Sequence, residues 1–466
     1  MNKRVERLGT DPTLAVLIRL SLPAMSSLFI NATYNVVDSL FVGRYVGTAG
    51  LAAVGVIFPF FIFLISIAIL IGTGGAALIS RCLGAGARLS AQRFFGAAVL
   101  LIFAFGAAIA LLFAPLTPFW VRVLGSESLY ARQYFFIISL ASPFVIGSLA
   151  LNTIVYAEGR GAIGFFALAF SSVLNIFLDW LFISVFDLAV IGVALATFIA
   201  QIIGMLILLI SFLRPSGALR LNIVSIAAAL RALVRGIFAR RGSGLRRRTA
   251  AGEIIRIGLP ASTRTVSVVV LGFFMNRQAL LVGGEEGLAV VAVIFRVLGL
   301  IALPVFGINQ AFLPIASYNY GAQKPERVKA IVVQTVGLTL IMCYGAVILV
   351  QIFAEPLASL FNPEPRFVSM AARGFRIVFL CSPLIIINLV SSGLHQAIGM
   401  PMRGLLVAVS RILFFMLPLI IILPSFLGIF GIWLALPIGE FISAVFSSAM
   451  ALPILLRLGR EAEQKK

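Results

Sequence analysis

The sequence predicts an all-α polytopic membrane protein, with twelve transmembrane helices in two pseudo-symmetric lobes of six helices each. Three observations carry this prediction. The 466 residues are 61% hydrophobic and only 11% charged, with a mean hydropathy of +1.13, which excludes an ordinary soluble protein. Apolar runs long enough to cross a hydrocarbon core of about 30 Å follow one another along the whole chain. Segments of the first half recur in the second half.

The apolar runs are predicted to be helices, because open strands would leave backbone polar groups without partners in lipid. They also lack the alternation that is typical of a membrane barrel. A helical span needs about 20 residues. The predicted spans lie near residues 15–43, 51–80, 94–120, 130–155, 161–186, 190–213, 254–283, 287–318, 328–353, 368–396, 402–424 and 429–456.

The internal repeat keeps one register. Three pairs of segments share an offset of 237, since 260−23, 287−50 and 321−84 all give this number. With six spans each, both halves enter the membrane in the same direction, which predicts parallel repeats with a central cavity between them. The pairs are RLSLPA and RIGLPA (Arg19–Ala24, Arg256–Ala261), GLAAVGVIF and GLAVVAVIF (Gly50–Phe58, Gly287–Phe295), and LGAG and YGAQ (Leu83–Gly86, Tyr320–Gln323).

One long hydrophilic break, Arg214–Glu253, divides the chain. Residues 1–213 hold spans one to six, residues 214–253 form a basic linker, and residues 254–466 hold spans seven to twelve. With both termini and the linker in the cytoplasm, most Lys and Arg lie inside, as the positive-inside rule requires. We therefore expect a multi-pass protein of the inner (plasma) membrane without a cleavable signal peptide. The outer loops then hold only Arg44, Arg122, Arg132, Arg366, Arg373 and Arg376.

The linker has two interpretations, and both remain open. Its apolar residues recur at helical spacing, which favours a basic amphipathic helix on the inner leaflet. A solvated linker whose arginines only fix the topology explains the same pattern. The apolar positions are Ile223, Ile226, Leu230, Leu233, Val234 and Ile237.

The net charge of +20 does not indicate nucleic-acid binding, because the basic residues lie between apolar spans and form no single face. We read them as topology signals and contacts with membrane lipid. Cys82, Cys343 and Cys381 are far apart and form no CxxC pair, which argues against a metal cluster or a disulfide framework. The chain is expected to act as a monomer.

A carboxylate and an amide lie within an otherwise apolar stretch of the fifth span. Asn175 and Asp179 are four residues apart, so on a helix they lie one turn apart on one face. A charged carboxylate at this depth costs roughly 2.5–3.5 kcal/mol on insertion scales, so it normally faces the bundle interior or an aqueous cavity. This makes Asp179 a functional candidate.

The repeat provides a control for this hypothesis. If these polar groups only built the fold, the second half would carry them too, and it does not. The first lobe is therefore predicted to hold a function that the second lacks. The counterparts of Asp38, Asn175, Asp179 and Thr197 are Met275, Phe414, Pro418 and Leu436.

Several motifs together resemble those of the multidrug and toxic compound extrusion (MATE) transporters, in particular the bacterial multidrug-export branch. The resemblance covers both halves. The motifs are LSLPA at Leu20–Ala24, the residues Tyr34, Asn35 and Asp38 followed by Phe41–Gly43, NIFLDWLFI at Asn175–Ile183, GVALAT at Gly192–Thr197, GINQAFLPIASYNYGA at Gly307–Ala322, and HQAIGMP at His395–Pro401.

The resemblance implies an antiporter that exports drugs or other amphipathic, cationic small molecules against an inward flow of H⁺ or Na⁺, with no cofactor beyond the coupling ion. It implies a cation site at Asp38, Asn175, Asp179 and Thr197, and a helix bend at Pro23. The chemistry agrees independently. Two carboxylates, an amide oxygen and a hydroxyl form an oxygen-only site that can hold Na⁺ or share protons.

Weaker candidates remain. Glu440 is the only acid of the second lobe at clear membrane depth, and its expected partner is Arg264, Arg296 or Arg411. A pair that holds helices together explains it as well as a transport role does. Tyr156, Asn276 and Gln310 are candidates to line the central cavity, and hydrogen bonding between helices explains these three polar residues equally well. The candidate cavity-lining residues are Tyr34, Asn35, Tyr156, Asn276, Arg296, Gln310, His395 and Glu440.

Two other functions are alternatives to export. A flippase of a lipid-linked saccharide, from the same two-lobed superfamily, needs a cationic cavity, for which Arg264, Arg277 and Arg296 are candidates. The oxygen-rich acid cluster speaks against it. An integral membrane enzyme requires a nucleophile, an acid–base pair or a metal constellation, and the sequence shows none.

Overall fold

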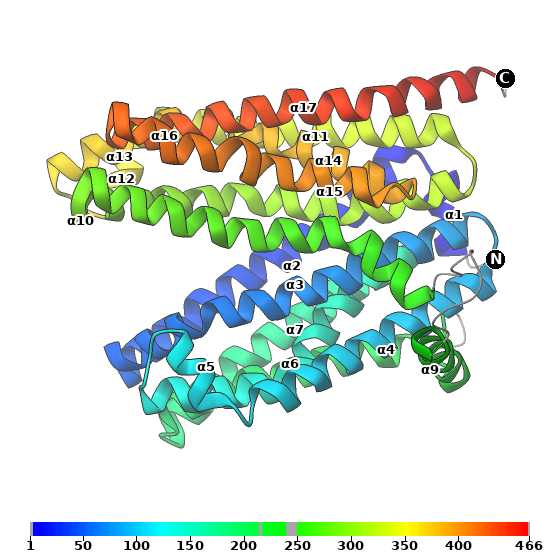
Figure 1. Cartoon of the computed structure of the whole chain (residues 1–466), viewed down its shortest axis with the longest axis horizontal. Coiled ribbons are helices and arrows are strands. Elements are labelled where there is room, and N and C mark those ends of the chain that lie inside the picture. Colours follow the sequence, from blue (N-terminus) through cyan, green and yellow to red (C-terminus); the bar gives the residue numbers. More distant parts are fainter. Residues whose placement is uncertain (1–2, 214–216, 239–248, 465–466) are drawn as a thin grey trace.

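The computed structural model describes residues 3–213, 217–238 and 249–464, and over these residues the chain is helical apart from turns and short connections. Figure 1 shows two helical bundles lying side by side, with both termini at the same end of the molecule. Helices α2 to α8 form one bundle and α10 to α17 the other, so the two halves of the sequence fold as two lobes.

The first bundle follows the predicted spans, with one difference. The third span was expected to reach residue 120, but α4 ends at Phe113, because Pro115 cannot donate the next helical hydrogen bond. The elements are α1 (Lys3–Thr10), α2 (Thr13–Phe41), η1 (Val42–Val46), α3 (Thr48–Gly84), α4 (Arg88–Phe113), α5 (Thr117–Val123), α6 (Leu129–Val155), η2 (Tyr156–Glu158), α7 (Gly161–Asp179), η3 (Trp180–Val185) and α8 (Ala189–Ser211).

A separate helix, α9 (Ile223–Phe238), forms in the linker. It packs on α4, where Gln92 Nε2 donates to Ser225 Oγ at 3.3 Å, and the carbonyl of Ser225 lies over Gly96. The helix of the first interpretation is therefore present. Its placement on the inner leaflet stays a prediction, and the arginines at 240, 241 and 246–248 fall outside the described residues.

The second bundle contains the longest helix, α10 (Ala250–Gly321), which turns at Gly284 and so holds spans seven and eight. The tenth span was expected to be one helix, but it is broken near Pro383 and bent by 40°. The other elements are α11 (Pro325–Ile352), α12 (Ala354–Ser359), α13 (Pro365–Val378), η4 (Ser382–Leu384), α14 (Ile385–Ala397), α15 (Pro401–Val409), η5 (Ser410–Met416), α16 (Leu417–Leu427) and α17 (Ile429–Glu463).

The number of spans agrees with the prediction. Within the described ranges, ten helices are long and apolar enough to cross a membrane, and the bent pair α13 and α14 adds an eleventh. Dividing α10 at Gly284 gives twelve. The predicted fold class is confirmed.

The backbone itself repeats between the lobes. Gly47 has φ 82° and ψ −165°, and Gly284, 237 residues later, has φ 61° and ψ −157°. Gly86 (φ 74°) and Gln323 (φ 54°) are also 237 residues apart. Positive φ is unfavourable for most side chains, so chance would rarely place it at equivalent positions. The two lobes therefore share turns as well as sequence.

The lobes meet closely at the end that carries the termini. A Cβ atom on Gly84 would lie 2.0 Å from the carbonyl oxygen of Tyr318, and one on Gly321 would lie 2.0 Å from that of Arg81. The ends of α3 and α10 thus cross backbone to backbone, which only glycine permits. This crossing joins the two lobes and closes the molecule at this end.

Helix α1 adds to the closure, because it is bonded to the second bundle. Asn319 Nδ2 donates to the carbonyl of Leu8 at 2.9 Å, and Lys324 Nζ donates to that of Gly9 at 2.7 Å. The carbonyl of Asp11, just after α1, accepts a hydrogen bond from Arg327 Nη2. The N-terminal segment therefore ties the first lobe to the second.

Candidate functional site

Two acidic side chains of the first lobe lie close together inside the bundle. Asp38 comes from α2 and Asp179 from the end of α7, and these two helices pack against each other. Asp38 is 9% exposed and Asp179 is fully buried. Their carboxyl groups are near enough to interact directly. The structure thus brings together two acids that the sequence separates by 141 residues (179−38).

The polar atoms around this pair have few partners. Oδ1 of Asp38 and both carboxyl oxygens of Asp179 accept no hydrogen bond from any described residue. Asn175, one turn before Asp179 and 2% exposed, likewise has an amide oxygen that accepts no hydrogen bond and an amide N–H₂ that donates none to the described chain. Buried polar atoms are nearly always bonded, and each that is not costs about 1–3 kcal/mol. Such a cluster in one place is typical of a site that takes up a ligand.

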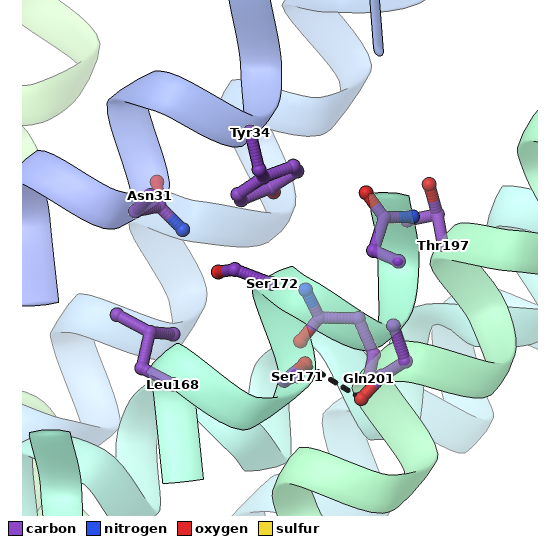
Figure 2. A pocket seen from close by; sticks show the side chains of 9 residues that line it. Asn31, Tyr34, Leu168, Ser171, Ser172, Thr197 and Gln201 are labelled. Atoms are coloured by element: carbon purple, nitrogen blue, oxygen red, sulfur yellow. Dashed lines mark hydrogen bonds between the residues drawn. The ribbon is translucent and has the colours of Figure 1, made fainter. Parts of the chain in front are cut away.

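A small cavity lies beside the acids, between α2, α7 and α8. It offers about 10 Å³ to the centre of a water-sized sphere, roughly the room for one water or one small ion. Figure 2 shows side chains from these helices converging on it. Its lining residues are Asn31, Tyr34, Leu168, Ser171, Ser172, Asn175, Thr197, Ala200 and Gln201.

Tyr34 connects the cavity to the acids, because it lines the cavity and lies within electrostatic range of Asp38 and Asp179. Thr197 is 6% exposed and also lines the cavity. The four residues of the predicted cation site are therefore buried in one region, on α2, α7 and α8. Asn175 and Thr197 border the cavity itself, and the carboxyl groups lie next to it.

Sequence reasoning missed four polar residues of the cavity. They could have been found from helical spacing, because each lies on the face of a predicted site residue. Asn31 is seven residues before Asp38, Ser171 is four before Asn175, and Gln201 is four after Thr197. Ser171 Oγ donates to the carbonyl of Ala200 at 2.7 Å, and Ser148 donates to Gln201. Ser172 completes the set.

The backbone is irregular next to the acids. The π-helix η1 begins four residues after Asp38, and η3 begins immediately after Asp179. A third π-helix, η5, contains Arg411. A π turn breaks the regular hydrogen-bond ladder and is frequent at functional sites. All three π segments of the described chain thus adjoin or hold a charged side chain within a span.

The other predicted cavity residues are dispersed. Tyr156 is buried against Gly161 and Gly164. Asn35 is exposed and donates within its own helix, to the carbonyl of Asn31 at 2.7 Å. Helix α2 continues through Pro23, whose carbonyl accepts from Ser27 Oγ at 2.7 Å.

The predicted cavity residues of the second lobe also lie apart from the small cavity. Gln310 donates to Asn152 Oδ1 at 3.2 Å and so links the lobes, and His395 Nδ1 lies 2.7 Å from the carbonyl of Ser391. Asn276 and Arg296 are exposed. Their role in a transport cavity stays a prediction.

The second lobe contains a buried ion pair instead of an acid pair. Arg411 Nε donates to both carboxyl oxygens of Glu440, at 3.1 and 3.0 Å. Of the three arginines that the sequence offered as partners of Glu440, Arg411 is therefore the one that pairs with it. Both side chains are under 10% exposed. Arg264 lies within electrostatic range of Arg411 and forms no ion pair with the described part of the chain. This cluster carries one excess positive charge.

Comparison with known proteins follows the same division into halves. The family model MatE matches residues 23–181 and 260–422, more than half of the chain, and the two matched segments begin 237 residues apart. The multidrug export protein MepA of Staphylococcus saprophyticus is 26% identical over 451 residues, 95% of this chain and 93% of that protein. MepA of Staphylococcus aureus strain NCTC 8325 is 25% identical, covering 96% and 95%.

Solved structures agree on the fold. A MATE transporter in complex with MaL6 superposes with a TM-score of 0.88 at 23% identity, over 99% of this chain and 100% of that one. A MATE transporter in the straight conformation gives 0.88 at 24% identity, over 97% and 98%. The family match, the relatives over nearly the whole length and the shared fold lead to one conclusion: this chain belongs to the MATE family and is a membrane transporter, not an enzyme.

Proposed function

We propose that this protein is a cation-coupled antiporter that exports drugs or other amphipathic, cationic small molecules, driven by H⁺ or Na⁺. The observation that supports this most is the pair Asp38 and Asp179, buried together with carboxyl oxygens that accept no hydrogen bond from the described chain. Two adjacent carboxylates in a buried site are stable only when a cation or a proton compensates their charge. Binding and release of that cation supplies the coupling.

Each residue of the proposed site has a role. The carboxyl groups of Asp38 and Asp179 take up the proton or share Na⁺, and the side-chain oxygens of Asn175 and Thr197 complete an oxygen-only ligand set. Tyr34 borders both the acids and the cavity and limits access of water. Because Asp38 is on α2 and the other groups are on α7 and α8, a bound cation draws α2 toward them.

Coupling then requires that the drug and the cation favour different shapes of the first lobe. A ligand shifts a conformational equilibrium only by its differential affinity for the two states. We propose Pro23 as the point at which α2 bends, since a proline within a helix removes a backbone hydrogen bond. Drug binds between the lobes and is released when the cation stabilises the other shape.

The domain and topology assignments belong to the same proposal. Residues 1–213 and 254–466 are the two lobes, and 214–253 is the linker on the cytoplasmic side. Both termini lie in the cytoplasm, and the protein works as a monomer in the inner membrane without nucleic acid. The asymmetric distribution of Lys and Arg along the sequence supports this orientation.

The test is drug efflux from proteoliposomes with separately imposed pH and Na⁺ gradients. Efflux that responds to one of the gradients supports the proposal, and efflux that ignores both contradicts it. Asp179→Asn removes the titrating group and keeps its shape. Asp187→Asn is the matched control, because Asp187 follows on the same segment but is exposed.

One observation favours the second candidate, a flippase of a lipid-linked saccharide. The excess positive charge of Arg264, Arg411 and Glu440 in the second lobe suits a phosphate-bearing cargo. Transfer of a fluorescent lipid-linked saccharide between leaflets, measured without a cation gradient, distinguishes the two. Export needs the gradient and the acids of the first lobe, whereas this activity needs the arginines.

A further inference from the structure

A second cavity, of about 580 Å³, opens at the end of the second bundle that lies away from both termini. In Figure 1 this is the end where α12, α13 and the turn between α16 and α17 are found. The volume is within the range of cavities that hold small organic molecules. The lining residues are Arg366, Ser369, Met370, Arg373, Arg376, Ile377, Ile429, Phe430 and Trp433.

The polar groups of this lining are hydrogen-bond donors. Helix α13 places Arg366, Arg373 and Arg376 seven and three residues apart, on one face. From α17, Trp433 is only 4% exposed, and its indole N–H finds no acceptor in the described ranges. The lining includes no carboxylate. A site with donors and no anion of its own is complementary to an anionic group.

The charges at this end are only partly compensated. Arg366 pairs with Glu286 at 3.1 Å and Arg376 with Glu355 at 3.2 Å, both from outside the lining. Arg373 forms no ion pair with a described residue. One guanidinium, in the middle of the row, therefore remains available to bind an anion.

Topology alone does not account for these arginines. In the orientation proposed above, they are three of the six basic residues in the loops on the outer side of the membrane, although positive charge is normally concentrated in the cytoplasmic loops. Residues that run against this trend need another reason to be present.

The surroundings of the cavity are apolar and exposed. Leu360, in the turn after α12, is 81% exposed. Phe426, near the end of α16, is 80% exposed, and Phe430, at the start of α17, is 44% exposed. Such a surface is stable in contact with acyl chains and unfavourable in water. A tryptophan at this level is typical of the interface between membrane and water. The cavity therefore joins a cationic row to a lipid-facing wall.

We propose that this cavity binds one anionic phospholipid from the leaflet at this end of the molecule. Its phosphodiester oxygens accept hydrogen bonds from Arg373 and from the Trp433 indole, and its acyl chains lie over Phe426 and Phe430. The inference does not rest on the coupling mechanism of the first lobe, because it uses none of the same residues.

Trp433 offers a local reporter. The chain has three tryptophans, so Trp120→Phe with Trp180→Phe leaves Trp433 as the only indole. The full-length protein in detergent is titrated with phosphatidylglycerol brominated on its acyl chains, and separately with phosphatidylcholine carrying the same chains. We expect Trp433 fluorescence to be half-maximally quenched at a phosphatidylglycerol concentration about tenfold lower than the phosphatidylcholine concentration that has the same effect. One charge-assisted hydrogen bond accounts for such a factor.

The variants locate the effect. Arg373→Gln is expected to abolish the preference for phosphatidylglycerol over phosphatidylcholine. Arg373→Lys retains the positive charge and is expected to keep part of this preference, so the proposal can still be tested if Arg373→Gln does not fold. Arg122→Gln is the matched control, because it removes an exposed charge on the same side of the membrane but in the other lobe, and it is expected to keep the full preference.

The proposal is overturned if the two lipids quench equally, or if Arg373→Gln retains the preference. Glycerophosphoglycerol, which has the same phosphodiester as phosphatidylglycerol but no acyl chains, is added as a competitor. If it displaces the brominated lipid at the concentration at which the lipid itself binds, the ligand is a soluble anion and the assignment to phospholipid is wrong.

Discussion

Asp38 and Asp179, from the first and fifth spans, face each other inside the first lobe, and three of their four carboxyl oxygens accept no hydrogen bond from a described residue. The part of the second lobe that the structure describes has no equivalent, since both carboxyl oxygens of its buried Glu440 accept hydrogen bonds from Arg411. The first lobe therefore holds two buried carboxyl groups without a counter-charge from the described residues, and the second lobe holds a buried carboxyl group that is paired with an arginine.

The first prediction concerns Asp179. Asp179→Asn is expected to reduce gradient-driven efflux to the level of protein-free liposomes while leaving expression and gel-filtration behaviour unchanged, because the amide keeps the shape but cannot exchange a proton. Asp187→Asn should transport like the wild type. Wild-type efflux by Asp179→Asn would exclude the coupling role.

The second prediction concerns the bend of α2. Pro23→Ala restores a helical hydrogen-bond donor and so makes the helix stiffer. We expect a larger loss in transport rate than in drug affinity, with affinity measured by fluorescence anisotropy at several pH and Na⁺ values. In the wild type, drug affinity should weaken as the coupling ion is added, because linkage is reciprocal. An affinity that is independent of both ions contradicts competition.

The third prediction concerns the crossing of Gly84 and Gly321. Gly84→Val forces a side chain against the Tyr318 carbonyl and should cost about 1–3 kcal/mol in the closed form. This shifts the ratio of open to closed molecules about 5- to 150-fold at the end with the termini. Distances between spin labels across this end would show the shift. Gly55→Val is the control, since nothing lies within 4 Å of a Cβ there.

The fourth prediction concerns the ion pair of the second lobe. Glu440→Gln leaves Arg411 buried without its counter-charge, which should lower stability by about 3–5 kcal/mol. Replacing both residues, as Arg411→Met with Glu440→Leu, should recover most of this in a thermal unfolding assay. If the double variant is stable and still transports, the pair has a structural role. If it is stable and inactive, the pair takes part in transport.

The fifth prediction concerns topology. In a variant without native cysteines, Val224→Cys on α9 and Glu285→Cys beside the Gly284 turn should be labelled from opposite sides of the membrane. Val224 is 72% exposed and Glu285 is also exposed, so both sites are accessible to a membrane-impermeant maleimide. Labelling of both positions from the same side would rule out the twelve-span arrangement.

Hydropathy and the repeat were enough to predict the helices and the two lobes. The errors fall at prolines: the third span stops before Pro115, and the tenth breaks near Pro383. Apolar content marks a segment as suited to lipid, but it does not show where a backbone hydrogen bond is lost.

The site was predicted in part. Asp38 and Asp179 stood out because acids are rare at this depth, whereas Ser171 and Gln201 did not, because uncharged polar residues are tolerated in membrane helices. The π-helices beside the acids, and the choice of Arg411 as the partner of Glu440, depend on packing between distant helices. No single stretch of sequence contains that information.

The matching turns at Gly47 and Gly284, and at Gly86 and Gln323, indicate that the two halves arose by duplication of one unit. The buried charges do not follow this duplication, because the first half holds an acid pair and the second half holds an ion pair. The two halves therefore share their turns and differ in their buried chemistry.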